Sequence, residues 1–294
     1  MNSELKNIIE RIDQLKAEVD ALRPMKPEQE QRLLQKVRLD WNYHSSKIEG
    51  NTLSYGETKA LLLWGITAQG KPLRDHLEMK GHNEAVEYIM DILKGKEIPI
   101  TEHFIREFHK IIIPEEYFLD AKTPDGLPAK RKITPGQYKT MPNHVETPTG
   151  EIFYFASPEE TPAKMMDLMN WYKKECEEKK DHPLIIASMF HYQFLRIHPF
   201  DDGNGRMSRL LMNLILMQFG YPPAIVQTER REDYINSLQY ADADDFDKFI
   251  IFIGERLIES LELWLKAAKG EAIDEVVDME KVIKNLNDKI DGKK

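Results

Sequence analysis

The first 22 residues show a regular apolar pattern that predicts a helix. Apolar residues recur at alternating intervals of three and four, at Leu5, Ile8, Ile12, Leu15, Val19 and Leu22. This is the a/d spacing of a coiled coil sustained for about three heptads, and Pro24 and Pro27 end it. Two interpretations stay open. We slightly favour packing of this seam on its own chain, and the alternative is a self-association arm that permits a homodimer.

Helical periods continue along most of the chain, so we predict a mainly α fold. The expected helices cover residues 28–49, 58–64, 83–93, 102–113, 161–178, 182–196, 207–219, 232–240 and 246–269. The segment 184–195 is apolar on nearly all sides, which is typical of a central buried helix. Residues 274–290 form an amphipathic pattern, and we expect this C-terminal helix (region 271–294) to dock on the body of the protein.

Residues 114–150 break the helical pattern with repeated proline and glycine. Within this stretch, residues 140–147 and 151–155 flank Pro148-Thr149-Gly150, which predicts a β-hairpin near residues 138–155. We expect this hairpin to be the only strand pair. No internal repeat is visible, and no linker clearly divides the chain.

Composition narrows the class of protein. The chain has 294 residues, of which 41% are apolar and 31% charged, and this suits a globular body with a large core. A net charge of −9 disfavours nucleic acid as a partner, and the single Cys176 excludes an internal disulfide. No secretory signal and no bilayer-spanning stretch is visible, so we expect a cytoplasmic protein without a membrane partner.

The run from His198 to Arg209 concentrates chemically useful residues. Gly203-Asn204-Gly205 before a helix can turn successive N–H groups toward one anion, and the helix dipole adds to this effect. Arg206 and Arg209 are three residues apart, so they share a helix face and can reach neighbouring phosphates.

A base and two carboxylates precede this turn. His198 titrates near neutrality and can take a proton from a hydroxyl group. Asp202 adjoins Gly203, so we prefer it to Asp201 as a ligand that holds Mg²⁺ against bound phosphates. Each residue alone has an ordinary structural explanation, but their joint order indicates a site for a metal-bound phosphate.

This run resembles the motif of the Fic family, His-x-Phe-x-Asp/Glu-Gly-Asn-Gly-x-x-x-Arg, and the likeness extends over roughly residues 80–265. The resemblance implies a Fic-type helical core over residues 80–270 with a β-hairpin flap. It also implies transfer of AMP from ATP to a Ser, Thr or Tyr hydroxyl of a target protein, with release of pyrophosphate. Self-modification is included among the expected reactions.

The resemblance also implies roles for single residues. His198 is expected to be the general base, and Asp202 to hold Mg²⁺ between the α- and β-phosphates. The anion cradle is expected to be formed by Gly203, Asn204 and Gly205, with Asn204 at the α-phosphate. A kinase-like branch of the family carries Lys at the position of Gly205, so phosphoryl transfer is disfavoured here.

Further roles concern the triphosphate, the adenine and the target. Arg206 is expected at the β-phosphate and Arg209 at the γ-phosphate. Tyr234 aligns loosely with the adenine pocket, and a core tyrosine is an equal alternative. The flap is expected to clamp a target segment by strand addition, with Tyr138 and Met141 as candidate contacts.

A second match lies upstream, in the expected helix at about residues 28–50 of an N-terminal helical region, residues 1–79. The segment Ser45 to Gly50 resembles the family's inhibitory motif, Ser/Thr-x-x-x-Glu-Gly/Asn. Ser45 and Glu49 are four apart and share a helix face. The resemblance implies that Glu49 pairs with Arg209 and holds ATP in a pose unsuited to in-line attack. Taken alone, Glu49 would be an unremarkable surface carboxylate.

Two other functions stay open. In some family members the inhibitory Glu positions a water that removes AMP, and Glu49 would then be catalytic. The chain could also bind nucleotide as a regulatory protein without chemistry, although intact His198 and Asp202 argue against this. A DNA-binding module has little support from the sequence.

Overall fold

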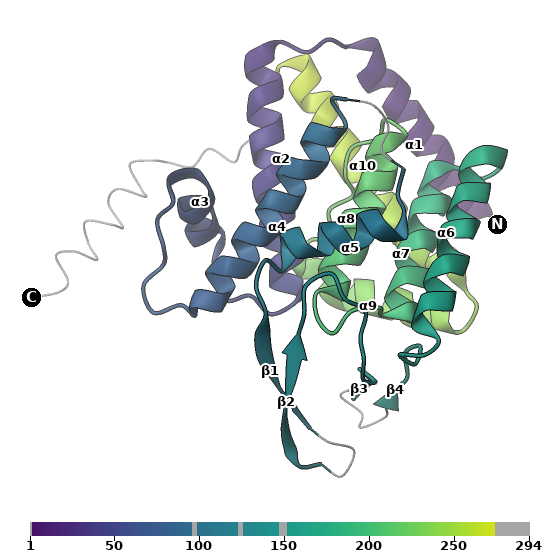
Figure 1. Cartoon of the computed structure of the whole chain (residues 1–294). Coiled ribbons are helices and arrows are strands. Elements are labelled where there is room, and N and C mark those ends of the chain that lie inside the picture. The colour runs from purple at the N-terminus through teal and green to yellow at the C-terminus, as the bar shows by residue number, and fades with distance from the viewer. Residues whose placement is uncertain (1, 96–98, 123–125, 147–151, 274–294) are drawn as a thin grey trace, which may run out of the picture.

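The structure is a computed structural model, and it describes residues 2–95, 99–122, 126–146 and 152–273. Helices dominate this part of the chain, and two small hairpins extend from one end of the helical body (Figure 1). The mainly α fold class is therefore confirmed. In order, the elements are α1 (Ser3–Ala21), α2 (Pro27–Ile48), α3 (Tyr55–Trp64), α4 (Leu73–Ile92), α5 (Glu102–Ile112), β1 (Tyr117–Lys122), β2 (Pro128–Ile133), β3 (Val145–Glu146), β4 (Ile152–Phe153), α6 (Thr161–Glu178), α7 (Pro183–Ile197), α8 (Asn204–Gln218), a 3-10 turn (Thr228–Arg230), α9 (Arg231–Asp242) and α10 (Phe246–Lys269).

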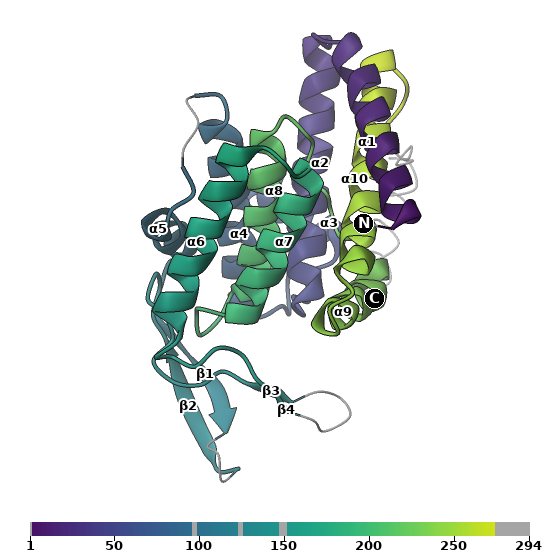
Figure 2. The same cartoon turned by 90° about the vertical axis from the view of Figure 1, so that its right-hand side faces the viewer.

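The apolar seam of α1 packs against α10 of the same chain. The two helices run side by side (Figure 2), and the seam residues Leu5, Ile12, Leu15 and Val19 are buried. Gly254 of α10 permits this close approach, because a Cβ at that position would lie 2.4 Å from Ile8 Cγ2. The favoured interpretation of the seam is confirmed. Most of its apolar face is covered by α10, whereas Leu22 is exposed, and a homodimer stays a prediction.

Helix α8 is the most enclosed element of the core. It packs against α7, α4 and α2, and its residues from Met207 to Leu216 are all buried. Helix α7 lies beside it and buries one face, with Phe190 and Phe194 fully covered. The functional run is thus anchored on both sides by well-packed helices, which fixes the loop between them.

The expectation of a single strand pair was wrong. β1 and β2 form an antiparallel hairpin with Tyr117 opposite Ile133 and Lys122 opposite Pro128. This hairpin projects from the body (Figure 1), and Phe118 is 63% exposed, so its strands lack the apolar alternation that marks a half-buried sheet. The predicted hairpin is present but shorter: Val145 pairs with Phe153 and Glu146 with Ile152. Its predicted turn lies outside the described residues.

Helix α4 starts at Leu73, well before the expected start at residue 83. Gly81 interrupts the apolar pattern for a packing reason, since a Cβ there would lie 2.5 Å from the carbonyl oxygen of Ile112 in α5. The helix runs through residues 79 and 80, where the N-terminal region was expected to meet the core. The expected helix at 274–290 lies outside the described residues. In the part described, no helix is both long and apolar enough to cross a membrane.

Candidate active site

The functional run forms the loop that joins α7 to α8. His198 ends α7 with a φ of +51°, and Gly203 precedes α8 with a φ of +79°. Glycine adopts this left-handed backbone freely, but for another L-residue it costs about 1–2 kcal/mol. The conformation of His198 therefore has to be held by its surroundings.

The ring of His198 is fixed in one orientation. It stacks on Phe155, which follows β4, with 3.9 Å between ring centroids. Its Nδ1 lies 3.3 Å from the carbonyl oxygen of Leu195. A carbonyl can only accept, so Nδ1 carries the hydrogen and Nε2 keeps a free lone pair. Burial, assisted by the charge of Lys139, lowers the pKa of His198 to about 3, so the ring is neutral at pH 7.

Asp202 is surrounded by hydrogen-bond donors. Its carboxylate accepts from Tyr117, from Arg74 at 3.2 Å and from Arg206 at 3.4 Å. Burial acts to raise the pKa of Asp202, but Arg206 and the donors of Tyr117 and Gly203 outweigh it and the pKa falls below its usual value. The carboxylate is therefore ionised at neutral pH.

Asp201 points to a different partner. Its carboxylate lies 3.4 Å from Arg131 of β2, and burial raises its pKa. The structure thus places Asp202, and not Asp201, in contact with Arg206 of α8. The preference for Asp202 as a Mg²⁺ ligand stays a prediction.

The start of α8 presents backbone N–H groups that have no partner inside the helix. The side chain of Asn204 is used within the loop: it accepts from the N–H of Phe200 at 2.9 Å and donates to its carbonyl at 2.7 Å. Gly205 lets another side chain approach, since a Cβ there would lie 2.2 Å from Glu49 Oε1. The inhibitory-motif carboxylate therefore lies directly against the anion cradle.

Arg206 is buried with unused donors. Only 3% of its side chain is exposed, and its ion pairs are with Asp202 and, at 3.9 Å, Glu78. Among the described residues, Nε and Nη1 have no hydrogen-bond partner. Buried donors without a partner are uncommon and costly. This guanidinium is suited to receive an anion.

Arg209 is equally buried, and its donors are engaged. Nη2 lies 2.8 Å from Glu49 Oε1 and donates to the carbonyl oxygen of Ser45 at 2.8 Å, while Nε donates to Ser45 Oγ at 3.1 Å. Ser45 and Glu49 lie at the C-terminal end of α2, where Gly50 turns the chain with a φ of +95°. The structure therefore brings Ser45 and Glu49 into contact with Arg209, and their inhibitory role stays a prediction.

Of three other predicted site residues, Tyr234 contacts Arg209 and Tyr138 packs against Phe200 of the loop. Tyr234 is buried in the core and its hydroxyl lies 2.9 Å from Nε2 of His191. Tyr138 lies outside the hairpin and donates to Glu102 at 2.9 Å, whereas Met141 is 59% exposed. The adenine contact of Tyr234 and the target contacts of the other two stay predictions.

Sequence reasoning missed several residues that hold the loop. His109 of α5 accepts from the N–H of Gly136 at Nδ1, so its Nε2 donates to the carbonyl of Asp202 at 3.1 Å. Lys139 and Asn143 contact the loop from the segment before β3. These partners are 50 or more residues from the loop along the chain, and no local spacing identifies them.

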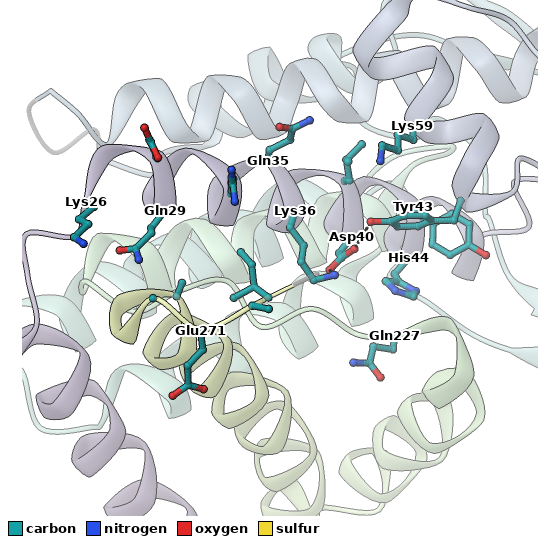
Figure 3. Close-up of a pocket in the computed structure, with 18 of the residues that line it drawn as sticks. Lys26, Gln29, Gln35, Lys36, Asp40, Tyr43, His44, Lys59, Gln227 and Glu271 are labelled. Atoms are coloured by element: carbon teal, nitrogen blue, oxygen red, sulfur yellow. Dashed lines mark hydrogen bonds and ion pairs between the residues drawn. The ribbon is translucent and has the colours of Figure 1, made fainter. Parts of the chain in front are cut away.

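A large hollow of about 1430 Å³ lies away from the loop, along the outer face of α2 (Figure 3). Its lining mixes charges of both signs, among them Lys36, Asp40 and Glu271, with the ring of Tyr43. No residue of the run 198–209 lines it. The chemistry indicated by the motif therefore belongs to the loop and not to this hollow.

Comparison with known proteins places the chain in one family. Residues 99–216 match the model of the Fic/DOC family. A Fic domain containing signalling protein from Bacteroides thetaiotaomicron is 40% identical, with a TM-score of 0.81 over 90% of this chain and 99% of that one. Fic-1 from Caenorhabditis elegans has a TM-score of 0.73 and 28% identity over 89% of this chain and 71% of that one.

Comparison with curated protein sequences indicates the same family. The protein adenylyltransferase Fic of Aedes aegypti is 34% identical over 76% of this chain and 41% of its own length, and that of Nematostella vectensis is 32% identical over 76% and 48%. The chain thus spans less than half the length of these relatives. From the motif, its geometry and these matches, the chain belongs to the Fic/DOC family.

Proposed function

We propose that the protein is an adenylyltransferase that moves AMP from ATP to a hydroxyl group of a target protein. The observation that carries this proposal is that His198, Asp202 and Arg206 lie together around the start of α8, with Asp202 paired to Arg206. The names of the curated relatives support the same activity. A protein target, in a cytoplasmic setting without nucleic acid or membrane, is part of this proposal.

The triphosphate of ATP would lie across the start of α8. The N–H groups of Asn204 and Gly205 would face the α-phosphate, and the dipole of α8 favours the negative charge. The guanidinium of Arg206 would bind the β-phosphate. Arg209 would bind the γ-phosphate once Glu49 leaves it.

His198 would act on the attacking hydroxyl. Its free Nε2 takes the proton as the hydroxyl oxygen bonds to the α-phosphorus. The bond between the α-phosphorus and the bridging oxygen breaks, and pyrophosphate leaves.

The donor set at Asp202 fits Mg²⁺. This ion commonly takes one or two carboxylates, several waters and substrate phosphates, and Asp202 offers one ionised carboxylate beside the cradle. When bound, Mg²⁺ would neutralise phosphate charge, and Tyr117 and Arg74 would keep the carboxylate oriented.

The contact of Glu49 with Arg209 would restrain this activity. While the carboxylate occupies the guanidinium, the γ-phosphate loses its ligand and ATP cannot take the reactive pose. A second candidate function is removal of AMP from a modified protein. Its support is the position of Glu49 against Gly205, where a carboxylate could orient a water toward a phosphate in the cradle.

The position of the label in ATP distinguishes AMP transfer from phosphoryl transfer. ATP labelled at the α-phosphate should label protein in the Glu49→Gly form, whereas ATP labelled at the γ-phosphate should not. Transfer of γ-label would mean phosphoryl transfer and would contradict the proposal. Incubation of AMP-modified protein with the wild type then tests removal, which predicts AMP release that is lost in Glu49→Gly.

A further inference from the structure

Four successive carbonyl groups, from Ile197 at the end of α7 to Phe200, accept hydrogen bonds from Lys139 and Asn143, and that of Phe200 also accepts from Asn204. Lys139 donates from Nζ to the carbonyl of Ile197 at 3.0 Å and from its backbone N–H to that of Pro199 at 2.8 Å. Asn143 donates from Nδ2 to His198 at 3.1 Å and to Phe200 at 2.9 Å. We call Lys139 and Asn143 the clasp.

The clasp is buried and internally bonded. Lys139 Nζ also donates to Asn143 Oδ1 at 2.8 Å, and both side chains are covered. A buried ammonium group is costly unless its surroundings use it. Neither residue takes part in a step of the proposed reaction. The hydrogen bonds that they donate to the loop therefore explain why they are buried.

Residues that flank the β3–β4 hairpin on both sides contact His198. One residue separates Asn143 from β3, and Asn143 holds the carbonyl of His198. Phe155 lies two residues after β4 and stacks on the imidazole ring. The backbone of the base is held from one end of the hairpin, and its ring from the other.

We propose that Lys139 and Asn143 are positioning residues that hold His198 in its left-handed conformation and fix the base relative to the β3–β4 hairpin. This inference rests on the proposed function and on the predicted role of the hairpin as the flap that clamps a target segment. A target on the hairpin is then already aligned with Nε2. Loss of the clasp lets the loop relax at His198, because Asn204 still bonds the carbonyl of Phe200 but the carbonyl of His198 is held by Asn143.

The activity test uses the Glu49→Gly form as parent. Asn143→Ala and Lys139→Met should each lower the kcat of AMP transfer by about 10²-fold, the cost of misplacing a catalytic group by about 1 Å. The KM and Kd for ATP should stay within about twofold, because the start of α8 is untouched. Lys139→Arg should recover part of the loss. The matched control is Lys130→Met, an exposed lysine of β2 paired with Asp120, which should behave as the parent.

An independent readout needs no activity. Diethyl pyrocarbonate modifies accessible neutral imidazoles, and peptide mass spectrometry reports the rate at each one. The clasp variants should raise the rate at His198 and leave exposed His103 unchanged. A purely structural role predicts a lower Tm with unchanged kcat and unchanged His198 reactivity, and that result overturns the inference. A parent without transfer, combined with raised His198 reactivity, would reject the proposed function and keep the clasp.

Discussion

Arg206 and Arg209 share one face of α8, yet their bonding differs completely. Each side chain is 3% exposed. Arg206 keeps two nitrogens without a hydrogen-bond partner among the described residues, whereas Arg209 contacts Glu49 and Ser45 through three interactions. Arg206 pairs with Asp202 and still has unused donors, whereas the donors of Arg209 are engaged by α2. We therefore infer that only one of the two expected phosphate ligands is available while Glu49 is in place.

The largest effect is expected from replacement of His198, the proposed general base. In the Glu49→Gly form, His198→Gln should lower the rate of AMP transfer by about 10²–10⁴-fold. ATP affinity should be nearly unchanged, because the phosphate ligands remain. Transfer kinetics and calorimetry of ATP binding check the two parts. A rate within threefold of the parent would exclude His198 as the base.

The next test targets the two arginines directly. Arg206→Gln should lower transfer by about 10²-fold in both the wild type and the Glu49→Gly form, as expected when one charge-stabilising donor is lost. Arg209→Gln should cause that loss only in Glu49→Gly, since Glu49 already occupies this arginine in the wild type. Equal losses from Arg209→Gln in both forms would remove the distinction between the two residues.

A smaller effect concerns the buried histidines beside these arginines. Burial, with help from the nearby arginine, lowers the pKa of His109 beside Arg206 to about 4 and of His191 beside Arg209 to about 3. The unfolded state binds protons near pH 6.5 and the folded state does not, so stability is full above pH 6.5 and falls toward the folded pKa values. From pH 7.5 to 6.0 we expect a loss of about 1.5 kcal/mol from the pair. Urea unfolding at both pH values measures it, and His191→Gln should reduce the slope.

The smallest expected effect concerns Ser45. Ser45→Ala removes the acceptor of Arg209 Nε and should cost about 1 kcal/mol of stability. Because the Glu49 contact remains, basal transfer should rise by only a few-fold. Denaturant unfolding and label incorporation measure the two effects. A rise as large as that of Glu49→Gly would show that Ser45, and not the carboxylate, occupies the arginine.

The sequence predicted the features whose physical cause lies in the spacing of residues within one element. The seam of α1 and the period of α10 identified these helices because each buries one continuous face. The spacing of Ser45 and Glu49, and of Arg206 and Arg209, placed each pair on one helix face. The contact between Glu49 and Arg209 was predicted only from the family resemblance, because periodicity does not indicate which distant helix faces are in contact.

Other features had no local signal. The β1–β2 hairpin stands away from the body, so its strands show no apolar alternation. The start of α4 was obscured because Gly81 is required by the carbonyls of α5. The clasp depends on hydrogen bonds between residues 139–143 and carbonyls more than 50 positions away. These features follow from tertiary contacts that no short window of sequence contains.

The central claim is that Glu49 holds Arg209 away from ATP, and one measurement tests it most directly. Purified wild type, Glu49→Gly and the double variant Glu49→Gly/His198→Gln are incubated with ATP labelled at the α-phosphate, and protein-bound label is counted. We expect little label in the wild type, strong self-labelling in Glu49→Gly and background in the double variant. Equal labelling of the wild type and Glu49→Gly would contradict the claim.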